Sequence, residues 1–293
     1  MSEKKPGKKS TSKKNSKKKL SSTSTVDFLA TPQSIESLLT GFGGRRKGRS
    51  TLDEAQEIMY DAWEATSRKR AVELARKALL VSADCADAYV FLAGVTAKTP
   101  QEVIDLYRQG VEAGERALGK KAFKEDVGYF WGLLETRPFM RARAGLAQSL
   151  WEAGQREDAI DHYWDLLRLN PNDNQGIRDM LMPCLIELNR DKDAEKLYKQ
   201  YENDDMAVWN YSRALLDFRK HGESSAADKS LKAAIERNKH VPLYLLGRKK
   251  LPSNLPDHYG MGDDNEAVLY ASANHAAWRS TPGGLEWLAA KVK

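Results

Sequence analysis

The sequence predicts an all-α protein, a superhelix (solenoid) of paired helices preceded by a disordered basic N-terminal tail. Two observations predict the superhelix. From Thr51 onward, apolar residues recur at helical spacing with no sustained period-two alternation, and the same small and aromatic residues return from one segment to the next. A third observation, the clustering of lysines near the N-terminus, predicts the tail.

The tail carries the positive charge of the chain. The 293 residues include 47 Lys and Arg against 41 Asp and Glu, a net charge of +6. Residues 1–19 hold nine lysines and one acid, Glu3, so they carry +8 and the remainder sums to −2. Such a Lys/Ser/Thr-rich segment does not offset the roughly 1–2 kcal/mol per residue that ordering costs. A Gly- and Arg-rich stretch follows at 41–49, and we expect residues 1–49 to form a disordered tail and linker.

The lysine-rich tail has two interpretations. It could contact nucleic acid phosphates, with an affinity that falls steeply as salt rises. It could also be a solvated tail that aids solubility. The second is favoured because no aromatic residues interleave the lysines to stack on bases.

The clearest repeat unit runs from Met140 to Asp173. Its first half places three apolar residues on one helical face, a glycine allows a left-handed turn, and its second half repeats a small–aromatic pair before a proline ends the unit. These positions are Leu146, Ala147, Leu150, Gly154, Ala159, Tyr163, Leu166 and Pro171. The pattern resembles the tetratricopeptide repeat, about 34 residues that form two antiparallel helices.

Weaker copies surround that unit. They are outlined by Ile58, Ala62, Ala71, Ala75 and Ala78, by the segments 87–97 and 100–118, by Leu181, Leu185, Ala194 and Tyr198, and by Trp209, Leu216, Ala227, Leu231 and Ala234. We therefore expect tetratricopeptide-like repeats over 50–241, followed by an irregular and helical C-terminal cap over 242–293 that hides the last open face.

Two stretches depart from this rhythm. Phe123, Phe130 and Trp131 fall on one face if residues 123–134 are helical, and we expect that stripe to be core. Thr136 is the expected N-cap of the next helix, with Pro138 in its first turn. Pro183 lies inside an expected helix over 175–188, so we expect that helix to kink or split there.

A narrower resemblance rests on two long strings. Residues 130–143 read FWGLLETRPFMRAR and residues 169–176 read LNPNDNQG, and together with 241–247 and Trp287 they resemble the suppressor-of-tumorigenicity-seven-like family, including its bacterial tetratricopeptide members. The resemblance covers roughly residues 50–290 and implies a helical-repeat interaction protein without established catalysis. Animal members of that family are membrane proteins, whereas no apolar run here reaches the ~20 residues that span a bilayer.

No catalytic or metal-binding pattern is present in the sequence. The five histidines are scattered without metal-ligand spacing, and Cys85 and Cys184 stand alone, so both are expected to be buried, reduced thiols. Gly41 to Gly44 lack the following Lys and Ser/Thr of a phosphate-binding loop. We expect no enzyme activity, no cofactor and no metal.

A binding function would then depend on the residues that the repeats expose on their concave surface. In tetratricopeptide arrays the first helix of each pair lines the concave groove, and by repeat register the groove residues here are Arg141, Gln148, Trp151, Asp179 and Asn210. The alternative is that they are ordinary surface residues, with Trp151 packed between helices. The carboxylate clamp of chaperone-binding relatives needs Lys and Asn where this chain has Ala144 and Gln148, so we do not expect that specificity. Arg137, Arg141 and Arg143 would instead favour an acidic peptide.

The sequence thus predicts a cytoplasmic, non-catalytic scaffold that binds an unidentified protein or peptide partner through its concave groove, without contact with a membrane. The alternative function is a nucleic-acid-associated factor that uses the lysine-rich tail.

Overall fold

The computed structural model describes residues 50–292, and these fold into helices with no strand among them. The predicted tail and linker, residues 1–49, lie outside the described residues. The helices are α3 (Thr51–Glu64), α4 (Arg68–Val81), α5 (Ala86–Thr96), α6 (Pro100–Glu125), α7 (Arg137–Glu152), α8 (Arg156–Leu169), α9 (Ile177–Glu187), α10 (Asp191–Gln200), α11 (Ala207–His221), α12 (Ser225–Arg237), α13 (Val241–Leu245), α14 (Asp264–Ser280) and α15 (Gly284–Lys291), with short 3-10 turns η1 (Phe130–Gly132) and η2 (Leu134–Thr136).

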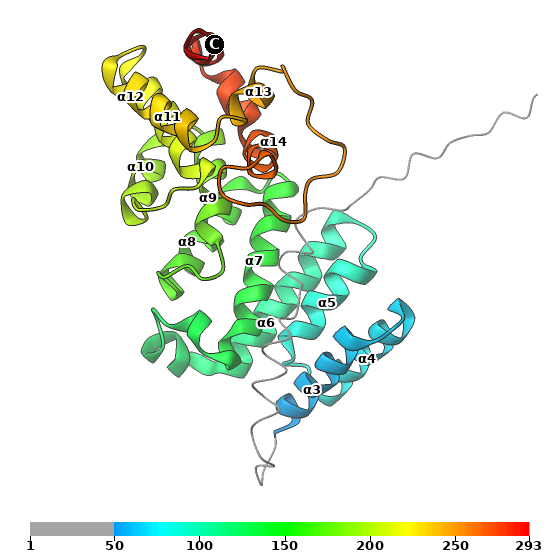
Figure 1. Ribbon diagram of the computed structural model, residues 1–293. Coiled ribbons are helices and arrows are strands. Elements are labelled where there is room, and N and C mark those ends of the chain that lie inside the picture. Colours follow the sequence, from blue (N-terminus) through cyan, green and yellow to red (C-terminus); the bar gives the residue numbers. More distant parts are fainter. Residues whose placement is uncertain (1–49, 293) are drawn as a thin grey trace, which may run out of the picture.

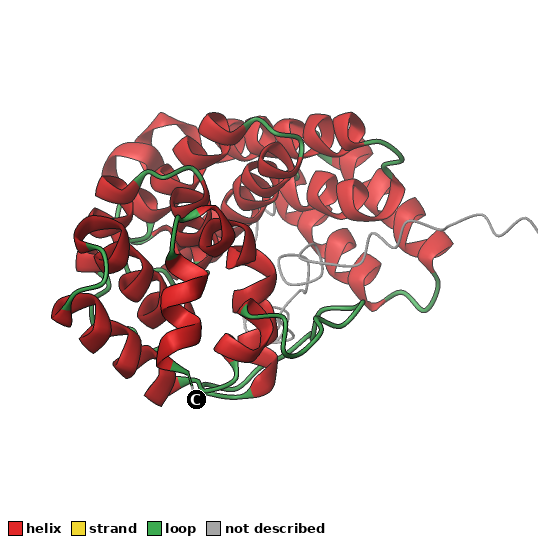
Figure 2. Cartoon of the chain, turned by 90° about the horizontal axis from the view of Figure 1, so that it is seen from above, coloured by secondary structure: helices red, strands yellow, loops and turns green. Residues whose placement is uncertain are grey.

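Successive helices form pairs, and the pairs stack. α3 packs on α4, α5 on α6, α7 on α8, α9 on α10, and α11 on α12. The first helices of neighbouring pairs also touch, α3 with α5, α5 with α7, and α9 with α11. Figure 1 shows this succession and Figure 2 shows, from above, that the helices follow an arc. The predicted tetratricopeptide-like superhelix is confirmed.

Small residues set how closely the helices approach. Ala147 and Ala159 are fully buried beside Tyr163, as the repeat pattern predicts. At Gly145 on α7 the neighbouring helix approaches even more closely, because a Cβ atom there would lie 2.2 Å from the Tyr107 ring of α6. The α6–α7 contact therefore depends on a residue without a side chain.

The stretch between α6 and α7 is not the continuous helix that its aromatic spacing predicts. Helical geometry is already broken at Gly119 (φ 66°), and the chain turns again at Gly128 (φ 99°) before η1 and η2. The expectation of a core cluster is nevertheless confirmed: Phe130 and Phe139 are fully buried, and Phe123 packs within 5.2 Å of both ring centroids. Glycines at left-handed angles override the apolar periodicity here.

Two local expectations change in the structure. Thr136 lies at the N-cap position of α7, but its hydroxyl donates to the carbonyl oxygens of Phe130 and Leu133 instead of capping the helix. Pro183 lies inside α9, which stays one helix from Ile177 to Glu187, so the helix does not split there, and the alternative of a kink stays a prediction.

The C-terminal residues close the stack. α14 begins at the predicted cap, where the Asp263 side chain accepts a hydrogen bond from the Glu266 N–H. In α15, Trp287 stacks on Phe218 of α11 at 4.5 Å between ring centroids, and its indole N–H donates to Asp228 of α12. The last helix thus covers the open end of the α11–α12 pair.

Candidate partner-binding face

The first helices of the pairs, α3, α5, α7, α9 and α11, form what we call the inner face. Two hollows are lined partly by these helices, one toward each end of the stack. The N-terminal hollow, of about 230 Å³, is lined by Leu52, Asp53, Gln56, Tyr60, Asp84, Ala86, Gly114, Ala117, Leu134, Glu135, Pro138, Phe139 and Arg141. The C-terminal hollow, of about 170 Å³, is lined by Asp179, Pro183, Met206, Val208, Tyr259, Glu266, Leu269, Tyr270, Ala273 and Asn274.

The ion pair of Arg141 with Asp87 lies beside the N-terminal hollow. Asp87, in the first turn of α5, is fully buried. Its carboxylate accepts from Arg141 Nε at 2.9 Å and Nη2 at 2.7 Å, and also from Gln56 Nε2 at 2.9 Å. This bidentate geometry joins α3, α5 and α7, so the Arg141 side chain has a structural role whether or not it meets a partner.

The other two arginines expected to attract an acidic peptide are also engaged within the fold. Arg143 pairs with Asp165 at 2.6 Å, and Arg137 donates to the Trp131 carbonyl oxygen at 2.9 Å. Meanwhile Asp53, Asp84 and Glu135 contribute carboxylates to the N-terminal hollow. The charge of this hollow therefore opposes the sequence-based expectation of an acidic peptide.

Gln148 and Trp151 lie together near the end of α7. The Gln148 amide oxygen accepts from the Tyr163 hydroxyl at 3.0 Å, and its Nε2 donates to Glu152 at 2.7 Å. Trp151 is partly buried against the core, and the Arg156 guanidinium lies 3.9 Å from its ring centroid. Trp151 therefore packs between structural elements while keeping part of its surface exposed.

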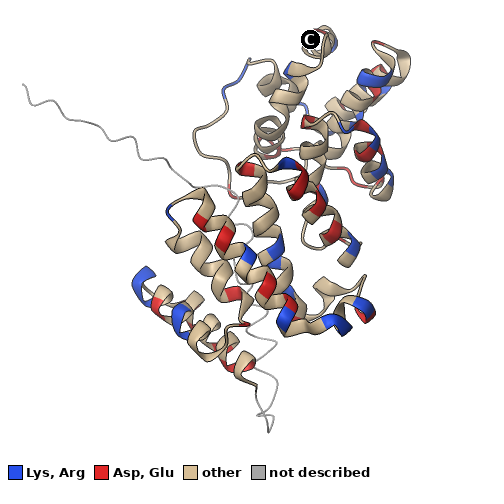
Figure 3. Cartoon of the chain, turned by 180° about the vertical axis from the view of Figure 1, so that it is seen from behind, with Lys and Arg blue, Asp and Glu red and all other residues tan. Residues whose placement is uncertain are grey.

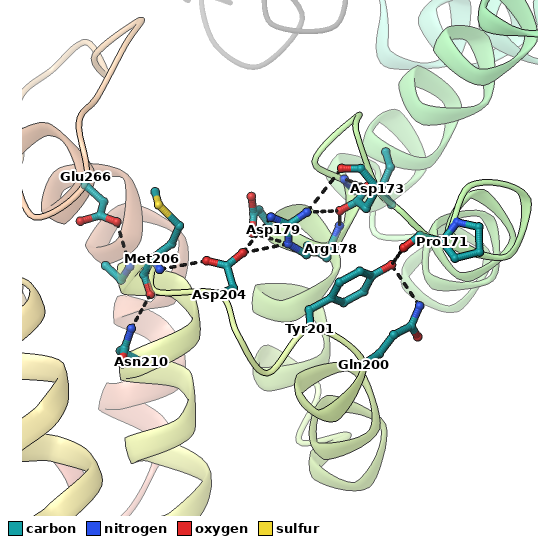
Figure 4. A network of polar contacts seen from close by, with 12 residues as sticks. Pro171, Asp173, Arg178, Asp179, Gln200, Tyr201, Asp204, Met206, Asn210 and Glu266 are labelled. Carbon is teal, nitrogen blue, oxygen red and sulfur yellow. Dashed lines mark hydrogen bonds and ion pairs between the residues drawn. The ribbon is translucent and has the colours of Figure 1, made fainter. Parts of the chain in front are cut away.

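Asp179 and Asn210 lie near the other end of the inner face, in the polar network shown in Figure 4. Asn210 Nδ2 donates to the carbonyl oxygens of Asp205 and Met206, so it holds the start of α11. Asp179 belongs to a cluster in which Arg178 is shared: its guanidinium lies 3.0 Å from Asp173, 2.8 Å from Asp204 and 3.9 Å from Asp179.

Asp179 is the most strongly perturbed carboxyl of this network. Burial raises the pKa of Asp179 to about 7, Arg178 opposes the rise, and the charges of Asp204 and Asp173 add to it. The carboxyl is therefore partly protonated near neutral pH.

α14 covers the C-terminal part of the inner face. It packs on both α9 and α11, which Figure 1 shows as neighbours of α13 and α14. The Glu266 carboxylate of α14 accepts from the N–H of Ala207 at 2.8 Å, from Asn238 Nδ2 at 2.8 Å and from the N–H of Gly262 at 2.8 Å. These bonds fix α14 against α9 and α11.

Sequence reasoning missed Asp87, Asn274 and Tyr259. Asp87 had a usable signal, because it is the one charge within the otherwise apolar segment 85–95. Asn274 and Tyr259 had none, since their role depends on how α14 and the segment before it fold back on α9.

Neither cysteine of residues 50–292 is activated. Burial raises the pKa of the Cys85 thiol to about 12, aided by Asp87, and burial also raises that of Cys184, so neither is a thiolate near neutral pH. Both cysteines are free and buried, as predicted. Within the described residues, no three His, Cys, Asp or Glu side chains gather in a way that could hold a metal ion.

Comparison with known proteins decides the family. The family model described as ST7 protein matches residues 48–293. The chain belongs to the ST7 family. The resemblance read from residues 130–143 and 169–176 is thereby confirmed. No helix within residues 50–292, the part that the structure describes, has the length and apolar character needed to cross a membrane.

Two similar proteins of the ST7 family are each longer than this chain. The Drosophila melanogaster "Protein ST7 homolog" is 26% identical over 285 residues, which cover 89% of this chain and 52% of that protein. The human "Suppressor of tumorigenicity 7 protein-like" is 27% identical over 259 residues, covering 81% and 45%. The chain therefore spans about half the length of the curated relatives it matches.

A solved structure of a tetratricopeptide protein is also similar. The crystal structure of YrrB, described as a TPR protein with an unusual peptide-binding site, is 19% identical to this chain and superposes with a TM-score of 0.45. The match covers 64% of this chain and 84% of YrrB.

Proposed function

We propose that this ST7-family chain is a non-catalytic helical-repeat scaffold that binds a peptide segment of another protein in the N-terminal hollow. The observation that carries the proposal is the lining of this hollow. Residues of α3, α6, α7, η2 and the start of α5 surround it, and they combine apolar side chains with carboxylates. An apolar hollow with a few placed polar groups is typical of a binding site.

The charge of the hollow favours a basic peptide with an apolar residue. Asp53 and Glu135 are exposed, and Asp84 is paired in part with Arg116 at 2.7 Å. The Arg141 charge is compensated by buried Asp87. Residues 1–49 hold 13 of the Lys and Arg residues and three acids, so the rest of the chain carries −4, which also favours a basic partner. Figure 3 shows acidic and basic residues interspersed along the helices.

Matched substitutions test the hollow. Leu52→Glu places a charge inside it, and Leu80→Glu makes the same change on α4 at a side chain that is 88% exposed and does not line the hollow. We expect affinity capture with Leu52→Glu to lose a partner that the wild type and Leu80→Glu both retain. Glu135→Lys should weaken capture of the same partner, because it reverses an exposed charge of the hollow. Identical partner sets for all four proteins would reject the proposal.

Three sequence-based expectations remain predictions. Gln148, Trp151, Asp179 and Asn210 are untested as partner contacts, and the cytoplasmic location awaits cell fractionation. The alternative function, nucleic acid binding, depends on lysines outside the described residues; salt-dependent retention on DNA or RNA, with and without those lysines, tests it.

A further inference from the structure

The C-terminal hollow is lined by two side chains with buried oxygen atoms that accept no well-formed hydrogen bond. Asn274 is 1% exposed; its Nδ2 donates to the Tyr270 carbonyl oxygen at 3.0 Å, while its Oδ1 accepts no hydrogen bond. Asp179 Oδ1 is also shielded from solvent; the Arg178 guanidinium lies 3.9 Å from it, and a weak hydrogen bond from the Trp209 indole partly offsets the rise that burial causes in the pKa of this carboxyl. Both residues line the same hollow of about 170 Å³. Buried acceptors without donors are costly, which makes this hollow a candidate for a ligand that donates.

The charge around the hollow is negative. Arg178 lies within ion-pair distance of three carboxylates, those of Asp173, Asp179 and Asp204, so one positive charge faces three acids (Figure 4). From α14, Glu266 adds a further carboxylate, although its oxygens are already occupied by N–H donors. Tyr259, from the segment before α14, also lines the hollow. This excess of acid favours a cationic donor over a neutral one.

The remaining walls of the hollow are aliphatic. They include Pro183 of α9, Val208 of α11 and Leu269 of α14. A ligand that fits must therefore combine a short hydrocarbon stem with a cationic head, so that the stem meets these walls and the head meets the acceptors.

We propose that the C-terminal hollow binds a primary alkylammonium group, the chemistry of a lysine side chain, with Asp179 Oδ1 and Asn274 Oδ1 as its acceptors. An ammonium has three donors and no acceptor, which matches a site made of oxygen atoms. The C-terminal hollow shares no lining residue with the N-terminal one, so a test of this site is independent of the proposed peptide-binding function.

Titration of the full chain with n-butylammonium tests the site, with n-butanol as a neutral probe of the same length. Nuclear magnetic resonance at constant ionic strength gives the affinity of each. We expect butylammonium to shift signals of α9 and α14 and butanol to bind at least about tenfold more weakly. Equal binding of the two probes would show that only the apolar walls matter and would overturn the proposal.

The pH dependence and a conservative variant add two independent readouts. With the pKa of Asp179 at about 7, its ionised fraction rises about tenfold between about pH 6 and about pH 8, and butylammonium affinity should rise with it. Asp179→Asn should lower the affinity about tenfold at pH 8 and abolish the pH dependence. Asp205→Asn, at an acid that does not line the hollow, should leave both unchanged. A pH dependence retained in Asp179→Asn would contradict the assignment.

The lysine could come from this chain or from another molecule. In a full chain whose nine lysines in residues 1–19 are replaced by glutamine, butylammonium should bind more tightly if these lysines normally occupy the site. Unchanged binding would assign the site to a lysine of another chain. Failure of butylammonium to bind in both backgrounds would overturn the proposal.

Discussion

Arg141 Nη2 lies 2.7 Å from Asp87 Oδ2, and this buried ion pair joins α7 to α5 across 54 positions of the sequence. The two side chains are 8% and 0% exposed. The Arg141 guanidinium also lies 6.0 Å from the Trp63 ring centroid of α3. The first three pairs are thus connected through one charged side chain, which also lines the hollow proposed to bind a partner.

Removing one member of this pair should destabilise the protein strongly. Arg141→Met leaves the Asp87 carboxylate buried without its cation, and we expect the free energy of unfolding to fall by about 3–5 kcal/mol. The double variant Arg141→Met with Asp87→Leu should recover most of that loss, because no uncompensated charge remains. Urea unfolding followed by circular dichroism measures both, with Arg168→Met, at an exposed pair with Asp165, as control. Equal losses for Arg141→Met and Arg168→Met would refute this role.

Gly145 should tolerate no side chain. The Cβ of alanine would lie 2.2 Å from the Tyr107 ring, so Gly145→Ala should cost about 1–3 kcal/mol despite the better helix propensity of alanine. Gly132→Ala is the matched control, since no atom lies within 4 Å of the added Cβ, and it should change stability by less than about 0.5 kcal/mol. Thermal unfolding of the two variants distinguishes them; similar melting temperatures would mean that α6 and α7 do not depend on this contact.

Asp179 should make stability depend on pH. The pKa of its carboxyl is raised from 3.8 to about 7 by burial, so the folded state holds the proton more tightly than the unfolded state. Its contribution to stability is therefore complete below about pH 4 and is lost as pH rises through about 7. Relative to wild type, Asp179→Asn should gain about 2–3 kcal/mol between about pH 5 and about pH 8 in urea unfolding. Parallel pH profiles for the two proteins would contradict the raised pKa.

Trp287 should hold the C-terminal end of the stack. It is 3% exposed, stacks on Phe218 and donates to Asp228. Trp287→Ala should cost about 3–5 kcal/mol, and Trp287→Phe, which keeps a ring but loses the donor, should cost less. Hydrogen exchange should show faster exchange in α11 and α12 for Trp287→Ala but not for Glu286→Ala at the neighbouring exposed position. Unchanged protection in Trp287→Ala would show that α15 does not cap this pair.

The helical spacing of apolar residues was enough to predict the fold, because each repeat is a local pattern in the sequence. Buried alanines and aromatic rings four residues apart specify paired helices without knowledge of distant contacts, as Ala159 and Tyr163 illustrate. The same reasoning failed for residues 123–134, where the apolar spacing is helical but Gly119 and Gly128 take left-handed angles. The spacing of apolar residues gives no information about the backbone angles of a single glycine.

The binding face was harder to predict because it depends on contacts between distant segments. Repeat register placed Arg141 on the inner face but gave no sign that Asp87, on another helix, would neutralise it. It also gave no sign that α14 would fold back over α9 and α11, since a non-repetitive segment of the chain leads into that helix. Residue type and spacing are enough to predict the repeats. The neutralisation of Arg141 and the packing of α14 over α9 and α11 depend instead on the assembled stack.

Site-specific photo-crosslinking tests the proposed binding face most directly. A photoreactive amino acid is placed at Leu52, in the N-terminal hollow, or at Leu80, on the exposed surface of α4, in otherwise identical full-length chains. The account predicts that a protein partner crosslinks from position 52 and that its attached peptide is rich in basic and apolar residues, with no such adduct from position 80. Adducts that form equally from both positions, or only from position 80, would contradict it.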